Sequence, residues 1–313
     1  MNDLPSSALS SSNDFVSSPF ALDNEAGYRA WRETKLALRT ATDPQRCIRV
    51  PAVSRFSPAL VDELDRQIKA YNHVVIESES SDDDRGPNGL LELSQCFDLQ
   101  HPVVADHADG EAVARLTAVA AQDARARYIP YTPSALNWHT DGYYHRAENT
   151  VRAFVLHCVQ PALRGGANCL LDPESVYMQL RDLSVDHIDA LMDDSVLTIP
   201  ENIRDGQRLR ESQTGALFSI DALGFGLHMR YSARPRNIVW KSDPRSQRAL
   251  RALEEVIQDS DCAVTLTLQP GQTLVCNNVL HTRTAYTDGG ESKRLLYRAR
   301  FRNRIRFRPQ RAA

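Results

Sequence analysis

The stretch Trp138-His139-Thr140-Asp141-Gly142-Tyr143-Tyr144 decides how the rest of this chain is interpreted. In extended backbone, residues two apart project from the same face of a strand, so the side chains of His139 and Asp141 converge on one point. An imidazole and a carboxylate so placed are two of the three ligands of a 2-His-1-carboxylate metal site, the ligand set of non-heme Fe(II) oxygenases. A His-x-Asp tripeptide also occurs by chance, so this hypothesis needs a third ligand elsewhere in the chain.

A third ligand and a cation for an organic acid follow near the C-terminus. His281 comes after the Pro270-Gly271 turn and a short apolar run, which places it at the end of a predicted strand. Arg294 and Arg298 share one face of the next predicted strand. A guanidinium can bind both oxygens of a carboxylate at once, which makes Arg294 the candidate anchor for an acid held beside the metal.

The overall composition is ordinary and argues against several classes of function. The 313 residues carry a net charge of −3, which argues against a general nucleic-acid-binding protein. No apolar run approaches the ~20 residues that cross a bilayer. The N-terminus lacks the basic and apolar segments of a secretory signal. The six cysteines are scattered without a Cys-x-x-Cys pair, which indicates reduced thiols in a cytoplasmic protein.

The order of predicted elements indicates one domain behind a short leader. Residues 1–20 are rich in Ser and are predicted to form a disordered leader, and residues 21–313 a single domain. The apolar periodicity, with capping residues before it, predicts helices over 24–40, from Pro58 onward, and over 174–183, 184–192 and 245–258. The Ala-rich segment 111–125 is also predicted to be helical.

Short strands are predicted over most of the second half of the chain. They cover 74–76, 151–159, 168–171, 264–268 and 273–276, with several more between 195 and 231. From Arg294 to Arg308 arginines recur with period 2, which predicts one long strand with a cationic face. The acidic segment 77–89 is predicted to be a loop, either solvated or acting as a lid over a site.

Many short strands with helices before and between them predict an α+β, mainly-β fold. The predicted architecture is a double-stranded β-helix, a cupin-like jelly roll, whose core covers roughly residues 128–308. Helical insertions and an N-terminal helical region complete it.

With these motifs in order, the chain resembles the Fe(II)/2-oxoglutarate-dependent dioxygenases of the taurine dioxygenase group. The resemblance covers roughly residues 128–301 and rests on three motifs: His139-Thr140-Asp141, Gly165-Gly166-Ala167-Asn168, and Asn277-Asn278-x-x-His281 followed by Arg294-x-x-x-Arg298. Within the group, the pattern is most similar to the glutarate 2-hydroxylase-like branch, which shares the glycine turn, a Met229-Arg230-Tyr231-like stretch and the paired asparagines.

The resemblance implies a ligand set, a cosubstrate and a reaction. His139, Asp141 and His281 would bind Fe(II) as the catalytic centre. Arg294 would pair with the distal carboxylate of 2-oxoglutarate, and Asn168 stands where many relatives place a Thr that touches the same carboxylate. The reaction would consume O2 and release succinate and CO2. The carboxylate at position 141 implies hydroxylation or desaturation, because halogenating relatives lack it.

The abundance of arginine around the predicted site favours a small anionic substrate, such as a dicarboxylate or an amino-acid derivative. Arg298 would face the cosubstrate or this substrate. The further candidates for substrate contact are Arg283, Arg230, Arg234 and Tyr143. A solvated surface for Arg230 and Arg234, and a packing role for Tyr143, stay open as alternatives. No nucleic-acid or membrane partner is expected, and homo-oligomerisation is left open.

Two other classes of protein also remain open. A non-catalytic jelly-roll binding protein would keep the pocket without turnover, and succinate formation separates it from an oxygenase. A zinc hydrolase could use the same three ligands, but Arg294 would then be superfluous.

Overall fold

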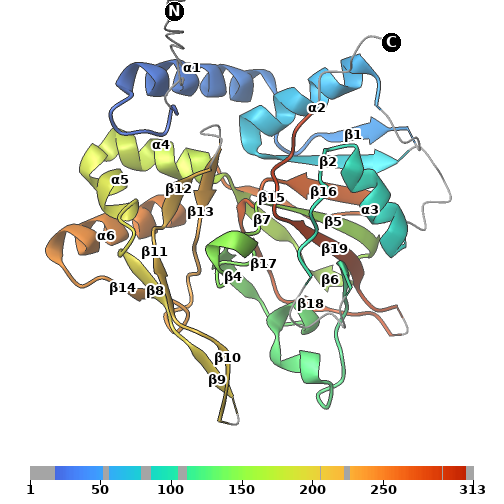
Figure 1. The fold of residues 1–313 in the computed structure, drawn as a ribbon. Helices are drawn as coiled ribbons and strands as arrows, with labels where there is room; N and C mark the ends of the chain where they lie inside the picture. Colours follow the sequence, from blue (N-terminus) through green and yellow to red (C-terminus); the bar gives the residue numbers. More distant parts are fainter. Residues whose placement is uncertain are drawn as a thin grey trace, which may run out of the picture.

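The computed structural model describes residues 18–51, 56–78, 86–104, 111–204, 206–221, 226–290 and 292–307. Its centre is a pair of β-sheets, shown on the right of Figure 1. In spatial order, the six-stranded sheet consists of β1 (Cys47–Val50), β2 (His73–Ser78), β16 (Gln272–Cys276), β5 (Ala153–Gln160), β19 (Leu295–Phe301) and β3 (Val113–Leu116). The four-stranded sheet consists of β15 (Val264–Leu266), β7 (Asn168–Leu171), β17 (Leu280–Arg283) and β4 (Leu136–His139).

The two sheets share one apolar core. Leu156 and Leu274 of the six-stranded sheet pack in one cluster with Leu170 of the four-stranded sheet. Because residues two apart share a face, the intervening residues of the six-stranded sheet, Val155 and Val275 among them, belong to a separate core on its other side. That side is covered by α2 (Pro58–Tyr71) and α3 (Pro87–Gln95).

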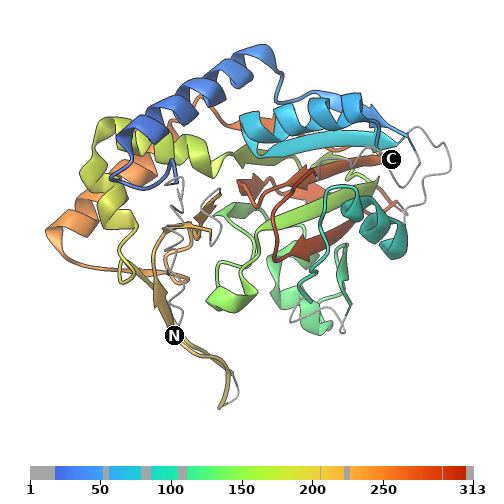
Figure 2. The ribbon, with the colours of Figure 1, turned by 45° about the horizontal axis from the view of Figure 1, so that its top comes forward.

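A helical layer lies beside the sheets and forms the left half of Figure 1; Figure 2 shows it from a view turned by 45°. Its helices are α1 (Glu25–Ala41), α4 (Pro173–Leu183), α5 (Val185–Leu191) and α6 (Pro244–Gln258). A three-stranded sheet belongs to this half and consists of β11 (Gln213–Gly215), β8 (Leu197–Ile199) and β14 (Val239–Trp240).

Small elements complete the structure. Three strand pairs stand apart from the larger sheets: β9 (Asn202–Arg204) with β10 (Gln207–Arg210), β12 (Phe218–Ile220) with β13 (Leu227–Met229), and β6 (Arg164–Gly165) with β18 (Tyr286–Thr287). Three short 3-10 helices occur at η1 (Ala124–Arg127), η2 (Ile129–Tyr131) and η3 (Ala147–Asn149). In the described ranges, no helix is long and apolar enough to cross a membrane.

The predicted helix starts are confirmed by capping hydrogen bonds. Asn24, Ser57, Asp172 and Ser184 each accept a backbone N–H at the start of α1, α2, α4 and α5, respectively. These caps satisfy backbone N–H donors that have no partner inside the helix. Because each capping residue is next to its helix in the sequence, the local pattern predicts these helix starts correctly.

The prediction of a helix over 111–125 is wrong. Residues Val113–Leu116 form β3 at the edge of the six-stranded sheet, where Ala114 pairs with Arg298 of β19. The alanines have a high helix propensity, but that preference is worth only a few tenths of a kcal/mol per residue and burial in a sheet outweighs it. Val113 and Leu116 are buried there.

Two boundary predictions are also wrong. The strand predicted to reach Arg308 ends at Phe301, which pairs with Ala153, the first residue of β5. Beyond Phe301 there is no β5 partner, so the ladder stops; Arg308 lies outside the described residues. The predicted loop over 77–89 ends early, because Pro87 opens α3 at a position where its missing N–H costs nothing. Residues 79–85 lie outside the described residues.

Most of the predicted leader, residues 1–17, lies outside the described residues. Its last residue, Phe20, belongs to the folded part, contrary to the prediction. The Phe20 side chain is 1% exposed and its ring centroid lies 4.9 Å from that of Trp31. An aromatic side chain with a ready apolar partner favours burial over a solvated leader.

Candidate active site

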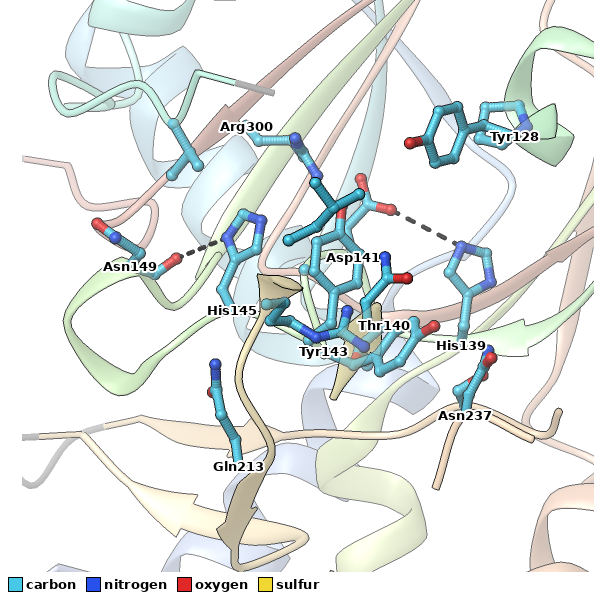
Figure 3. Close-up of a pocket in the computed structure, with 18 of the residues that line it drawn as sticks. Tyr128, His139, Thr140, Asp141, Tyr143, His145, Asn149, Gln213, Asn237 and Arg300 are labelled. Carbon is cyan, nitrogen blue, oxygen red and sulfur yellow. Dashed lines mark hydrogen bonds and ion pairs between the residues drawn. The ribbon is translucent and has the colours of Figure 1, made fainter. Parts of the chain in front are cut away.

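The register of β4 and β17 brings the two candidate histidine ligands together. His139 and His281 are direct cross-strand partners, and their ring centroids lie 4.2 Å apart. Asp141 follows just after β4, with Oδ1 3.7 Å from Nε2 of His139, as Figure 3 shows. One ligand atom from each of the three residues lies within 4.8 Å of the other two. The sequence prediction that these three residues converge is therefore met in the structure.

Backbone carbonyls set the tautomer of both histidines. Nδ1 of His139 lies 2.8 Å from the carbonyl of Asn137, and Nδ1 of His281 lies 2.9 Å from that of Val279. A carbonyl only accepts, so Nδ1 carries the proton in each ring and Nε2 presents its lone pair. Burial lowers the pKa of His139, and burial together with the neighbouring His139 lowers that of His281 to about 3. Both imidazoles are therefore neutral at ordinary pH.

Asp141 supplies a buried negative charge. Burial raises its pKa, but the charges of Arg298 and then Arg300 outweigh burial and hold the pKa well below its usual range. Nη1 of Arg298 lies 3.2 Å from Oδ1 and 3.0 Å from Oδ2 of Asp141. Two neutral imidazoles and one carboxylate, with their lone pairs directed to one point, fit a divalent iron.

Asn278 ties the segment that bears Asp141 to the segment that leads to His281. Its Oδ1 accepts the backbone N–H of Asp141 at 2.8 Å, and its Nδ2 donates to the Asp141 carbonyl at 2.9 Å and the Val151 carbonyl at 2.6 Å. Asn278 has φ of 48°, a left-handed conformation that asparagine tolerates better than most residues. No role for Asn278 follows from the sequence alone, although the paired asparagines before His281 mark its position.

The arginines of β19 project between the two sheets. Arg298 is the cross-strand partner of Leu156, and Arg300 that of Phe154, whose ring centroid lies 5.0 Å from that of His281. Because cross-strand partners share a face, the predicted cationic face is turned toward the metal-ligand sheet. Figure 3 shows Arg300 on the side of the cavity next to Asp141.

Arg294, the predicted cosubstrate anchor, is a buried cation with spare hydrogen-bonding capacity. Its side chain is 4% exposed, its guanidinium lies 5.0 Å from the centroid of the Tyr286 ring, and its Nη1 has no hydrogen-bond acceptor within the described part of the chain. Leaving such a donor unmatched in the interior is costly, so the position is suited to an incoming carboxylate.

Asn168 lies on β7 as the cross-strand partner of Arg283, two pairs along from the partners Leu170 and His281. Residues two apart on a strand share a face, so the buried Asn168 is on the same side of the sheet as His281.

Two predicted substrate residues are already engaged by the backbone. The Arg283 guanidinium donates to the carbonyls of Ile129, Pro130, Thr132 and Ser134. The Arg230 guanidinium donates to the carbonyls of Tyr143 and His145 and to the side chain of Gln213. Neither arginine is among the residues that line the large cavity. Both guanidiniums thus fix segments that form the cavity wall, and a role for them in substrate contact stays a prediction.

A cavity of about 1490 Å³ opens beside the three candidate ligands. His139 and Asp141 line it, as do the predicted substrate residues Arg234, Tyr143 and Arg298. Ten arginines but only three carboxylates contribute to the wall. Such an excess of fixed positive charge attracts anions and raises their local concentration.

The sequence as a whole confirms the predicted family. The sequence model of the family described as Taurine catabolism dioxygenase TauD, TfdA family matches residues 37–300, and the chain belongs to this family. It is an Fe(II)/2-oxoglutarate-dependent dioxygenase, with Fe(II) as cofactor and 2-oxoglutarate and O2 as cosubstrates. The fold is the mixed helix-and-sheet, cupin-like fold of that group.

Two curated relatives are named uridine-5'-phosphate dioxygenase. The one from a Streptomyces species is 31% identical over 195 residues, which cover 59% of this chain and 68% of the relative. The one from an Amycolatopsis species is 30% identical over 168 residues, which cover 52% of this chain and 59% of the relative.

Solved structures of similar fold include two non-heme iron oxygenases. An asparagine oxygenase in complex with Fe(II), hydroxyasparagine and succinate has a TM-score of 0.58 at 16% identity, covering 79% of this chain and 80% of that chain. The oxygenase OrfP in complex with Fe and alpha-ketoglutaric acid has a TM-score of 0.59 at 19% identity, covering 87% and 90%. At these identities the likeness concerns the fold alone.

Proposed function

We propose that this protein hydroxylates, or desaturates, a small anionic substrate at an Fe(II) ion held by His139, Asp141 and His281, with release of succinate and CO2. The observation that carries the proposal is the convergence of three donors within 4.8 Å, with the tautomers of both histidines fixed by backbone carbonyls. Three protein ligands leave open positions for cosubstrate and oxygen on a metal that prefers six ligands.

Bound Fe(II) supplies the oxygen activation that breaks an unreactive C–H bond while 2-oxoglutarate is oxidatively decarboxylated. The residues of this chain supply position and charge. Arg298 holds the Asp141 carboxylate through both oxygens, and Asn278 holds the Asp141 peptide. The ligand geometry is thus set before the metal arrives, which avoids rearrangement on binding.

Arg294 is proposed to bind the distal carboxylate of 2-oxoglutarate. Its burial and its unmatched Nη1 support this role, since a guanidinium fork is the preferred partner of a carboxylate. Asn168 is proposed to donate a further hydrogen bond to the same carboxylate from β7, because an amide can replace the hydroxyl of a Thr there.

The anionic character of the substrate is supported by the arginine excess of the cavity wall. The relatives named uridine-5'-phosphate dioxygenase make that nucleotide the first compound to test. Dicarboxylates such as glutarate and free amino acids follow, because the resemblance to the glutarate 2-hydroxylase-like branch and the amino-acid oxygenase neighbours of similar fold suggest them.

Three further features are proposed with the function: the architecture of the core, the domain organisation and the location in the cell. The facing sheets support a double-stranded β-helix core, and the match over 37–300 supports one domain over 21–313. Six cysteines without a disulfide between them support a cytoplasmic location.

The test is succinate release by anaerobically purified protein given Fe(II), ascorbate, 2-oxoglutarate and O2, with each compound in turn. Release stimulated by one compound and lost in Asp141→Ala supports the proposal. If iron is bound but no compound gives succinate, a non-catalytic binding protein explains the cavity better. If the metal-free protein releases no succinate with Fe(II) but gains a hydrolytic activity with zinc, a zinc hydrolase with the same three ligands is favoured.

A further inference from the structure

A second group of cations lies in the cavity wall, away from β19. Arg210 is the last residue of β10, and Arg234 follows β13; both line the cavity and both are half-buried. Arg210 comes from a strand pair that stands apart from the two central sheets, whereas Arg234 lies two residues beyond Ser232, which forms an isolated bridge with His139 of β4.

Tyr143 and Tyr144 connect this second group to the metal-ligand segment. The Arg210 guanidinium lies 5.5 Å from the centroid of the Tyr144 ring, which packs edge-on against the Tyr143 ring at 5.2 Å. Arg210, Arg234 and Tyr143 all line the same cavity, and the backbone N–H of Arg234 donates to the Ser232 hydroxyl at 3.5 Å. The Tyr143 backbone is in turn fixed by Arg230.

Neither guanidinium is neutralised by a carboxylate within the described residues. The side chain of Arg210 donates to the Pro200 carbonyl at 3.0 Å, but its buried Nε has no hydrogen-bond acceptor there. Arg234 makes no ion pair with any described residue. By contrast, Glu211, on the same wall, is paired with Arg146 at 2.7 Å and with Arg208 at 3.7 Å.

Two partly buried guanidiniums without a carboxylate partner give this part of the cavity wall a positive charge that attracts an anion. Two guanidiniums and a hydroxyl all donate hydrogen bonds, and together they suit the several acceptor oxygens and double charge of a phosphate group better than the single charge of a carboxylate.

We propose that Arg210, Arg234 and the Tyr143 hydroxyl form a subsite for the phosphate group of an organic phosphate monoester substrate. This inference rests on the proposed function and narrows its substrate class. The subsite shares one cavity with His139 and Asp141, so a substrate held by its phosphate would present its other end to the metal.

The test is calorimetric titration of the full-length protein, loaded with Mn(II) and 2-oxoglutarate so that no turnover occurs, with ribose 5-phosphate, ribose and glutarate. Ribose 5-phosphate is expected to bind at least about 10-fold more tightly than either other compound, because only it carries up to two negative charges on a single group. Arg210→Met and Arg234→Met should each weaken its binding about 10-fold, and Tyr143→Phe about threefold.

Arg208→Met is the matched control, because it removes the same charge from the same strand but from a side chain already paired with Glu211. It should change ribose 5-phosphate binding less than twofold. Unchanged Mn(II) binding in every variant shows that the fold and the metal site are intact.

Equal binding of ribose 5-phosphate and glutarate, or an Arg234→Met variant that binds like the Arg208→Met control, would overturn the subsite. Succinate release separates this failure from failure of the proposed function. If the phosphate does not bind but 2-oxoglutarate is still turned over with Fe(II), only the subsite is wrong.

Discussion

The two sheets that enclose the site differ in how they contribute to it. The four-stranded sheet carries both candidate histidine ligands as direct cross-strand partners, with each ring fixed by a backbone carbonyl. The six-stranded sheet contributes arginines of β19, whose long side chains reach the site from the facing side. Strand register therefore sets the ligand geometry, whereas the charge around it depends on side chains that can adjust.

This difference predicts that changes at the metal ligands reduce activity more than changes among the surrounding arginines. A one-residue change of register would turn a histidine to the other face of its sheet. The four-stranded sheet should therefore tolerate few substitutions that alter its strand pairing. Substitutions among the arginines change the strength of anion binding but leave the donors in place.

Asp141→Ala should lower turnover on the order of 1000-fold or more, because it removes one of the three protein ligands and the negative charge that the metal site is built around. The fold should remain, since this single carboxylate lies at the cavity wall and contributes little to the core. Succinate release and the far-UV circular dichroism spectrum measure the two effects. Full turnover with Fe(II) in this variant would show that the ligand assignment is wrong.

Asn278→Gly should weaken metal binding about 10-fold, the usual cost of losing a residue that orients a ligand. Glycine accepts the positive φ of this position, so the substitution removes the carboxamide without backbone strain. Mn(II) affinity measured by electron paramagnetic resonance reports the effect.

Asn277→Gly is the matched control for that change. Asn277 is also buried, but it bonds to Asn72 and to the backbone N–H of Ile305, away from the ligands. It should lower stability and leave Mn(II) affinity within about twofold of the wild type, since its partners are not ligand-bearing segments. An equal loss of affinity in both variants would mean that Asn278 acts only through stability.

Arg294→Lys should raise the KM for 2-oxoglutarate about 10-fold with a smaller change in kcat, because an ammonium cannot reproduce a bidentate contact. Steady-state kinetics with varied 2-oxoglutarate measures the changes in KM and in kcat separately. An unchanged KM would move the anchor to Arg298 or Arg300, the next arginines on the same face of β19.

Arg283→Lys should have the smallest effect on catalysis and act on stability instead. Its guanidinium donates to several carbonyls of the segment from Ile129 to Ser134, and a lysine cannot satisfy them all, at a cost of about 1–3 kcal/mol. Chemical denaturation measures the free energy of unfolding. Weaker substrate binding without a loss of stability would restore the substrate role that the sequence predicts for this residue.

The sequence predicts that His139 and Asp141 lie close together because metal chemistry restricts the residue types and a spacing of two keeps the side chains near each other, although Asp141 lies just after β4 and not in the strand. It predicts helix starts for the same local reason, since the caps of α1, α2, α4 and α5 lie within a few residues of the donors they satisfy. The pairing of His139 with His281 depends on strands far apart in the sequence, so no local pattern could supply it.

The roles of Arg283 and Arg230 could not be predicted from the sequence either. Both lie among arginines that resemble one another in sequence, and only the tertiary structure shows which guanidiniums are used by carbonyls and which face the cavity. The prediction of a helix over 111–125 is wrong for a similar reason. Strand pairing beside β19 at the edge of the sheet stabilises this segment more than the weak helix propensity of alanine does.

The central claim is that His139, Asp141 and His281 hold one Fe(II) ion, and anaerobic equilibrium dialysis of Fe(II) tests it most directly. The wild-type protein should bind one ion per chain, and each of the variants His139→Ala, Asp141→Ala and His281→Ala should bind at least about 10-fold more weakly while remaining folded. Wild-type affinity in all three variants would contradict the account, because the iron would then be held elsewhere.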